Sequence, residues 1–364
     1  MPVLFRALAL LAALIAAPAL AEVTATDILG REVTLEAPAR RIVLGEGRHM
    51  AVLGLLHGDP VSKVVGWRQD KALDEPTLAA YRQRFPAIDA IRPVGSGNRD
   101  ISVESIIALD PDLLVLSLMD ANDPGTDRAR EQVEAAGIPV AYVDFFSQPL
   151  ENSIPSLRIL GALTGGEAKA EEFAAFYESR LSRIRERLAD PSIPRPSVFF
   201  HVHAAPQGCC STVGQGVFAQ FIETAGGRNI GAEAVQGVLG NVSLEFLIGS
   251  DPDFYIATGG AHMAARGGLV LGTGVPEDAA RDSFATLIAA PGFSSLRAVE
   301  EGRAVGVWHL FNDTPSHIPL IEYLAKAFHP DLFADVDPAA TLAEIDARFS
   351  PVSVPGTWWI APQP

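Results

Sequence analysis

The side chains best suited to hold a ligand follow predicted strands. Arginine binds oxygen-rich groups through paired hydrogen bonds and stacks on planar surfaces, and tryptophan adds flat apolar area with one donor. Short apolar runs at 42–44, 64–66 and 305–307 predict buried strands. Because ligands bind beyond the carboxyl ends of strands in open parallel sheets, we expect the following loops to contact a ligand through Arg48, His49, Trp67, Arg68, Trp308, His309 and Phe311.

Three further loops add candidates of the same kind. Asn98 and Arg99 close a glycine-containing segment that precedes a predicted helix. His203 follows a predicted strand at 197–202, and His262 follows another at 254–257. We include these four side chains among the expected ligand contacts.

The histidines also allow a metal-site hypothesis. His201 and His203 are two residues apart, so both would point to one face of a strand. With His49, His262 or His309 they could bind a metal ion. The alternative is that His201 packs within the strand and His203 lines a cleft. We favour this alternative, and predict no metal site and no resident cofactor, because no His-Glu-x-x-His or Cys-x-x-Cys motif occurs.

Two segments that are 141 residues apart share one pattern. Residues 102–115 read SVESIIALDPDLLV, and residues 243–256 read SLEFLIGSDPDFYI. In each segment a serine can cap a helix, a glutamate lies in its first turn, and the helix ends before a proline. An apolar strand then follows. Two copies of this unit predict two similar α/β lobes.

The order of elements predicts an α/β fold with two Rossmann-like lobes and mainly parallel sheets. Between the lobes, residues 167–189 carry apolar side chains at helical spacing. Such a helix would span about 35 Å and could join the lobes, although a surface helix within one lobe is the alternative. We expect a signal peptide at 1–21, an N-terminal lobe at 22–150, a connecting helical segment at 151–195 and a C-terminal lobe at 196–364.

Charge and the N-terminal segment narrow the class of protein. The chain of 364 residues has 44 acidic and 28 basic side chains and a net charge of −16, which argues against nucleic-acid binding and against docking to anionic membranes. Arg6, an apolar run and a small-residue ending at Ala21 predict a cleaved secretory signal peptide. We therefore expect a soluble protein exported to a periplasm, not a membrane-spanning one. Cys209 and Cys210 are adjacent, and the sequence leaves their redox state open.

Several of these features together resemble one family. The signal peptide, the Thr26-Asp27-x-x-Gly30-Arg31 opening, the segment 38–43, the paired Ser-x-Glu units and the long central helix are similar to the helical-backbone periplasmic receptors of ABC importers. That family includes ferric-siderophore, haem and vitamin B12 receptors, and residues 308–333 look most like the iron-complex branch. The resemblance implies two lobes joined by a rigid helix, with a ligand cleft between them. It also implies that Glu104 and Glu245 meet arginines of a membrane permease.

The resemblance implies a receptor that captures a ferric siderophore, or a similar iron chelate, and delivers it to an inner-membrane ABC permease. We expect a monomer that catalyses no reaction. A haem or cobalamin receptor is one alternative, and haem would need an axial ligand. A receptor for bare metal ions and an exported enzyme are the others. For the enzyme, neither a Gly-x-Ser-x-Gly elbow nor a Walker A loop is present.

Overall fold

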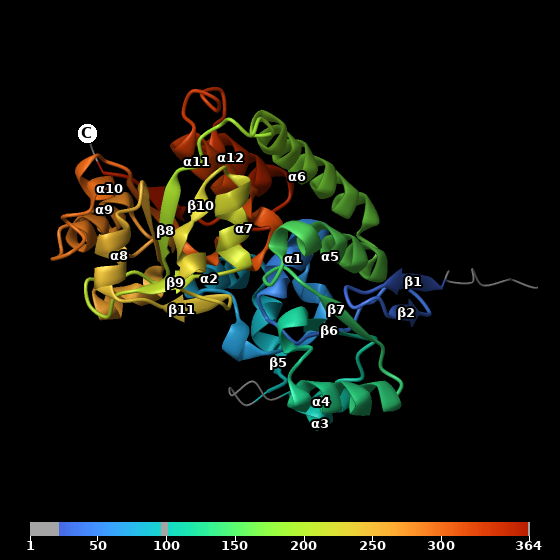
Figure 1. Cartoon of the computed structure of the whole chain (residues 1–364). Coiled ribbons are helices and arrows are strands. Elements are labelled where there is room, and N and C mark those ends of the chain that lie inside the picture. The colour runs from blue at the N-terminus through green and yellow to red at the C-terminus, as the bar shows by residue number, and fades with distance from the viewer. Residues whose placement is uncertain (1–21, 96–100, 363–364) are drawn as a thin grey trace, which may run out of the picture.

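The computed structural model describes residues 22–95 and 101–362, so the predicted signal peptide, Asn98 and Arg99 lie outside the described residues. The described residues form two α/β lobes that are joined by a pair of helices (Figure 1). The two lobes and their parallel strands confirm the predicted fold class. No helix in the described ranges is long and apolar enough to cross a membrane.

The N-terminal lobe contains a five-stranded sheet in the order β5-β4-β3-β6-β7. All of its neighbouring strands are parallel, as expected when helices connect successive strands. An antiparallel hairpin, β1–β2, precedes this sheet. The strands are β1 (Val23–Thr26), β2 (Glu32–Leu35), β3 (Ile42–Leu44), β4 (Val64–Trp67), β5 (Arg92–Pro93), β6 (Leu113–Ser117) and β7 (Val140–Val143), and the helices are α1 (His49–Leu56), α2 (Glu75–Arg84), α3 (Val103–Ala108) and α4 (Pro124–Ala135).

The C-terminal lobe has a mixed sheet, which is less uniformly parallel than the sequence predicted. Strands β10, β8, β12 and β14 run parallel to their neighbours in the centre, whereas β9, β11 and β16 are added antiparallel at the edges. A short antiparallel pair, β13–β15, lies apart from this sheet. The strands are β8 (Ser197–His201), β9 (Ser211–Val213), β10 (Arg228–Asn229), β11 (Leu239–Asn241), β12 (Phe254–Gly259), β13 (Gly272–Thr273), β14 (Ala304–Trp308), β15 (Gly356–Thr357) and β16 (Trp359–Ile360), and the helices are α7 (Val217–Thr224), α8 (Leu244–Ser250), α9 (Glu277–Ile288), α10 (Arg297–Glu300), α11 (Ile318–Phe328) and α12 (Pro338–Arg348).

Two helices join the lobes. Helix α5 (Pro149–Thr164) ends at Gly165, whose φ of 74° suits a glycine, and α6 (Glu167–Arg187) then turns back along it. Helix α6 packs against α1 of the N-terminal lobe and against α11 of the C-terminal lobe, and Figure 1 shows it leading from α5 towards α11 and α12. The long central helix predicted from the sequence is therefore present, and it contacts both lobes.

The repeated sequence unit folds in the same way in both lobes. Ser102 accepts a hydrogen bond from the backbone of α3 at 3.2 Å, and Ser243 accepts the equivalent bond in α8, also at 3.2 Å. Asp110 and Asp251 then take left-handed φ angles of 47° and 36°, at the residue before proline where right-handed helix is disfavoured. Strands β6 and β12 follow directly, so the repeat predicted local structure correctly in both copies.

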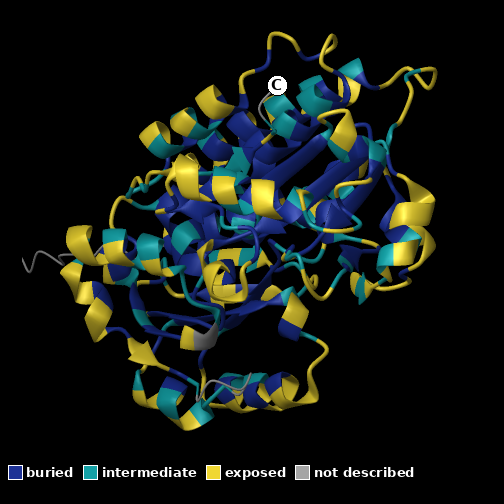
Figure 2. Cartoon of the chain, turned by 90° about the vertical axis from the view of Figure 1, so that its left-hand side faces the viewer, coloured by how far each residue is buried: buried dark blue, intermediate teal, exposed yellow. Residues whose placement is uncertain are grey.

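The core consists mainly of the strands and the helix faces that cover them. Figure 2 shows the central strands of the sheets as buried, while exposed positions lie on the outer helix faces, the loops and some edge strands. Cys209 and Cys210 form a disulfide in the loop between β8 and β9. Among the buried polar groups, Nε2 of His317 shares a hydrogen bond of 2.7 Å with the Tyr177 hydroxyl. This contact fastens α6 to the segment that begins α11.

Tyr177→Phe should destabilise the fold. The change leaves the ring nitrogen of fully buried His317 without its partner, and an unsatisfied buried group costs about 1–3 kcal/mol. The free energy of unfolding in urea measures this loss. Tyr323→Phe is the control, because the Tyr323 hydroxyl makes no hydrogen bond to the described residues while its ring stacks on Trp359. Equal losses in the two variants would show that the Tyr177–His317 bond contributes nothing.

Candidate functional site

A cavity of about 680 Å³ lies between the lobes. Its walls come from loops that follow β3 and β4 in one lobe and β12 and β14 in the other, which is the carboxyl edge of both parallel strand sets. We call it the cleft cavity. It is lined by Arg48, Lys71, Ala72, Asp74, Glu75, Pro76, Gly260, Ala261, His262, Thr273, Trp308 and Leu310.

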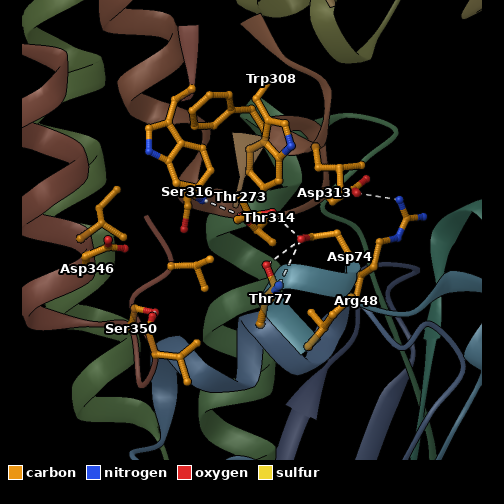
Figure 3. Close-up of a pocket in the computed structure, with 18 of the residues that line it drawn as sticks. Arg48, Asp74, Thr77, Thr273, Trp308, Asp313, Thr314, Ser316, Asp346 and Ser350 are labelled. Carbon is orange, nitrogen blue, oxygen red and sulfur yellow. Dashed lines mark hydrogen bonds and ion pairs between the residues drawn. The ribbon is translucent and has the colours of Figure 1, made fainter. Parts of the chain in front are cut away.

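A second cavity of about 150 Å³ adjoins the cleft cavity and shares several residues with it. Figure 3 shows this adjacent cavity, with Trp308 and Thr273 on one side and Arg48, Asp74 and Thr77 on the other. Helix α12 and the segment before β15 complete its wall. Most of its lining is apolar, and apart from Asp346 of α12 its charged side chains lie near the border with the cleft cavity.

Two polar contacts connect the lobes at this border. Nη1 of Arg48 lies 2.6 Å from Oδ2 of Asp313, and the Thr273 hydroxyl donates to Asp74. Asp74 also caps α2, accepting from the backbone of Thr77 at 3.2 Å and from its hydroxyl at 2.8 Å. Figure 3 marks these contacts with dashed lines. The same carboxylate therefore begins a helix of one lobe and holds a strand of the other.

Arg48 belongs to a network of charges behind the cleft cavity. Its Nη2 lies 2.6 Å from Glu46, whose other oxygen is 3.7 Å from Nζ of Lys71. Lys71 also pairs with Asp120 at 3.2 Å, and Asp120 pairs with Arg68 at 3.4 Å. The network thus holds three basic and, with Asp313, three acidic side chains. Its members come from the loops after β3, β4, β6 and β14.

Burial shifts the protonation of this network. Burial raises the pKa of Asp313 to about 6, although the positive charge of Arg48 acts in the opposite direction. Burial also acts to lower the pKa of Arg48, but the carboxylates of Asp313 and Glu46 outweigh it, so the pKa is raised. Arg48 is therefore a permanent cation, and Asp313 is the member of the pair that changes charge near neutral pH.

Three histidine rings meet at the same edge of the C-terminal sheet. The ring of His203 lies 3.8 Å from that of His309 and 5.0 Å from that of His262, measured between centroids. The pKa of His203 is lowered to about 4 by burial and by the charges of His262 and Arg266. Burial lowers the pKa of His262 and His309 too. All three imidazoles are therefore neutral at pH 7.

His201 does not join this group. Strand β8 ends at His201, and the left-handed backbone of His203, with φ of 48°, breaks the alternation that would have put both rings on one face. His201 is buried, and its Nδ1 is 2.7 Å from the Tyr255 hydroxyl. Within the described residues, no group of three or more His, Cys, Asp or Glu side chains is arranged to hold a metal ion by itself.

The predicted ligand contacts divide into two sets. Arg48 and Trp308 line both cavities, His262 lines the cleft cavity, and Phe311 lines the adjacent one. The ring of His203 contacts those of both His262 and His309.

Three other predicted contacts line neither cavity. His49, the first residue of α1, packs edge-on against Phe145, Trp67 belongs to the N-terminal core, and Arg68 is fully buried beside Asp120. His49 begins α1 and Trp67 ends β4, so only Arg68 lies in a loop as expected, and all three side chains are buried within the lobe. Sequence reasoning also missed Lys71, Asp74 and Asp313, which carry charge in loops after strands and could have been proposed on that basis.

Known proteins with similar sequences and structures indicate the family of this chain. The sequence profile of a family described as periplasmic binding protein matches residues 55–307. The chain belongs to the periplasmic binding protein family. A similar solved structure is the TroA-like periplasmic binding protein FepB from Veillonella parvula, which is 27% identical, with a TM-score of 0.86 over 94% of this chain and 100% of that one.

Other relatives differ in what they bind. A cobalamin-binding protein of Halobacterium salinarum is 27% identical over 246 residues, and the match spans 65% of this periplasmic binding protein but only 59% of the relative's length. A periplasmic haem-binding protein from Pseudomonas aeruginosa is 21% identical, with a TM-score of 0.57 over 90% of this chain and 99% of that one. At that identity the likeness extends to the fold alone.

Asp313→Asn should change how stability depends on pH. The pKa of Asp313 is raised above the ordinary value of about 4, so between about pH 4 and 6 the folded state binds a proton that the unfolded state has lost. The stabilisation that this raised pKa contributes is therefore complete below about pH 4 and decreases as the pH rises to about 6. Above about pH 6 the group no longer changes the pH dependence of stability. The variant should lose this falling component, which amounts to at most about 3 kcal/mol.

Urea unfolding at several pH values between 4 and 7 measures that slope. The control is Asp335→Asn, because hydrogen bonding to Arg187 lowers the pKa of exposed Asp335 to about 2. Its contribution is lost only as pH falls below about 4, so its variant should keep the wild-type slope between pH 4 and 6. An unchanged slope in Asp313→Asn would contradict the assignment.

Proposed function

We propose that this periplasmic binding protein is the substrate receptor of an ABC importer and captures an iron chelate, such as a ferric siderophore, in the periplasm. The cleft cavity carries this proposal. Its volume of about 680 Å³ falls in the range of about 300–1,000 Å³ typical of sites for small organic ligands. Walls from both lobes mean that the ligand would contact both lobes at once.

The lining suits a bulky, oxygen-rich complex. Lys71 and Arg48 supply positive charge, and Trp308 offers a flat face with a hydrogen-bond donor. Arg48 is already paired with two carboxylates, so an anionic ligand would share it rather than receive a free guanidinium. Lys71 is likewise paired with two carboxylates, Glu46 and Asp120, so neither cation offers an unpaired charge. This wall favours complexes that are close to neutral or carry a small negative charge.

We propose that capture involves no covalent step. The ligand would enter the cleft cavity and be released to the permease, and α6 would keep the change in lobe orientation small because it packs on both lobes. A cobalamin receptor is the second candidate, because a relative with 27% identity bears the name cobalamin-binding protein. Both candidates place a metal complex in the same cavity.

The repeated units supply two matched docking sites in this proposal. Glu104 and Glu245 are exposed in the first turns of α3 and α8, and neither forms an ion pair with the described residues. Three residues later, Ile107 and Ile248 lie on the same helix faces, and each is 42% exposed. Each lobe therefore presents a carboxylate beside an apolar side chain. We propose that permease arginines bind these carboxylates in bidentate pairs.

Ligand identity can be tested by tryptophan fluorescence. The mature chain should show saturable quenching by one class of ferric siderophore with micromolar or tighter affinity, because Trp308 lines the cleft cavity. Trp308→Phe should remove most of the quenching, while Trp67→Phe should keep it, since Trp67 lies in the core. Saturation by aquocobalamin alone would select the second candidate. Failure of ferric siderophores, haemin and aquocobalamin alike would contradict the proposed function.

The docking role can be separated from ligand binding. Combining Glu104→Ala with Glu245→Ala should abolish uptake of labelled ligand into cells that carry the cognate permease, yet change ligand affinity less than two-fold. The matched control combines Glu151→Ala and Glu277→Ala, which remove first-turn glutamates from α5 and α9. Normal uptake with the first pair, or a large loss of affinity, would show that these carboxylates are not docking groups.

A further inference from the structure

The three rings of His203, His262 and His309 are brought together by the order of strands in the C-terminal sheet. They follow β8, β12 and β14, which are adjacent and parallel. Residues separated by more than forty positions in the chain therefore meet at one carboxyl edge. His262 also lines the cleft cavity, so the group borders the space where the proposed ligand would lie. We call it the histidine edge.

One hydroxyl fixes the position of two of these residues. Oγ1 of Thr258 accepts from the backbone N–H of His203 at 2.9 Å and lies 3.1 Å from Nδ1 of His309. The same hydroxyl is 3.5 Å from the carbonyl oxygen of His201, to which it can donate. In the tautomer where Nδ1 of His309 donates to Thr258, its Nε2 carries a lone pair. A hydrogen bond to one ring nitrogen orients the other for metal binding in many proteins.

The remaining ring nitrogens of the histidine edge are not engaged. The rings of His203 and His262 make no hydrogen bond with the described residues, and both residues reach the surface although the surrounding protein partly buries their rings. His203 also holds a left-handed backbone, with φ of 48°, which is uncommon for a non-glycine residue and concentrates at functional sites. Imidazole nitrogens with these properties are ordinary ligands of iron, cobalt, nickel and copper.

We propose that the histidine edge supplies one or two imidazole ligands to a metal ion that arrives in the cleft already held by an organic chelator with exchangeable coordination positions. This inference rests on the proposed function and specifies the class of chelate. A bare ion would need three or four protein donors, whereas a chelated ion with open positions needs only one or two. His309 is the leading ligand, because Thr258 orients its ring.

Copper chelates test the coordination directly. Untagged protein labelled with ¹⁵N-histidine would be titrated with Cu(II)–nitrilotriacetate, which leaves coordination positions open, and with Cu(II)–EDTA, which fills them. Electron paramagnetic resonance should show ¹⁵N couplings with the first complex only. His309→Gln, alone and with His203→Gln, should weaken binding of the first complex at least ten-fold and remove the couplings. His57→Gln is the control, because His57 lies outside both cavities and bonds to Thr164.

The natural chelate types distinguish the possible sources of the metal. Ferric siderophores, haemin and aquocobalamin would each be titrated into the wild type and the histidine variants, and the visible spectrum of the bound complex recorded. The complex that binds should lose at least ten-fold in affinity, and its spectrum should shift, when His309 is replaced. Binding with the same affinity and spectrum in the variants would overturn this inference and leave the proposed function standing. If the wild type binds none of these complexes, both proposals fail.

Discussion

The ion pair between Arg48 and Asp313 is the contact on which the cleft depends, because it joins the loop after β3 to the loop after β14. Both side chains are largely buried, and removing charges from water costs as much as their attraction returns. The pair is therefore a poor source of stability but a strict condition on geometry. It is favourable only when the lobes are placed so that guanidinium and carboxylate meet at hydrogen-bond distance. The Asp74–Thr273 contact adds a second condition nearby.

Helix α6 explains why such conditions can be met. It packs on α1 and α11 at once, and its Tyr177 is bonded to His317 just before α11 begins. The lobes are thus held from behind by apolar packing and in front by a few polar contacts. The polar contacts fix how the two lobes are positioned relative to each other, a role that buried charge has in some proteins. A ligand entering the cleft would perturb the front contacts first.

The sequence predicted local structure well where one pattern governed it. The repeat located α3, β6, α8 and β12, and helical spacing located α6, because periodicity and proline position act over a few residues. Side-chain direction was harder to predict. Arg68 follows β4 as expected, but its burial depends on Asp120, which is 52 residues away in the chain. His203 was predicted as a cleft residue, but its meeting with His309 depends on the adjacency of strands, which no local pattern encodes.

The balance of charge behind the cleft bears on what can bind there. Three basic and three acidic side chains are already paired with one another, so a highly charged anion would have to displace internal carboxylates to gain full pairing. Each displaced carboxylate would be left buried without its partner, at a cost that exceeds the gain from a new pair. Neutral donors such as imidazoles and the indole of Trp308 have no such competition. The selectivity of this cleft should therefore come less from net charge than from groups that coordinate a metal or stack on its chelator.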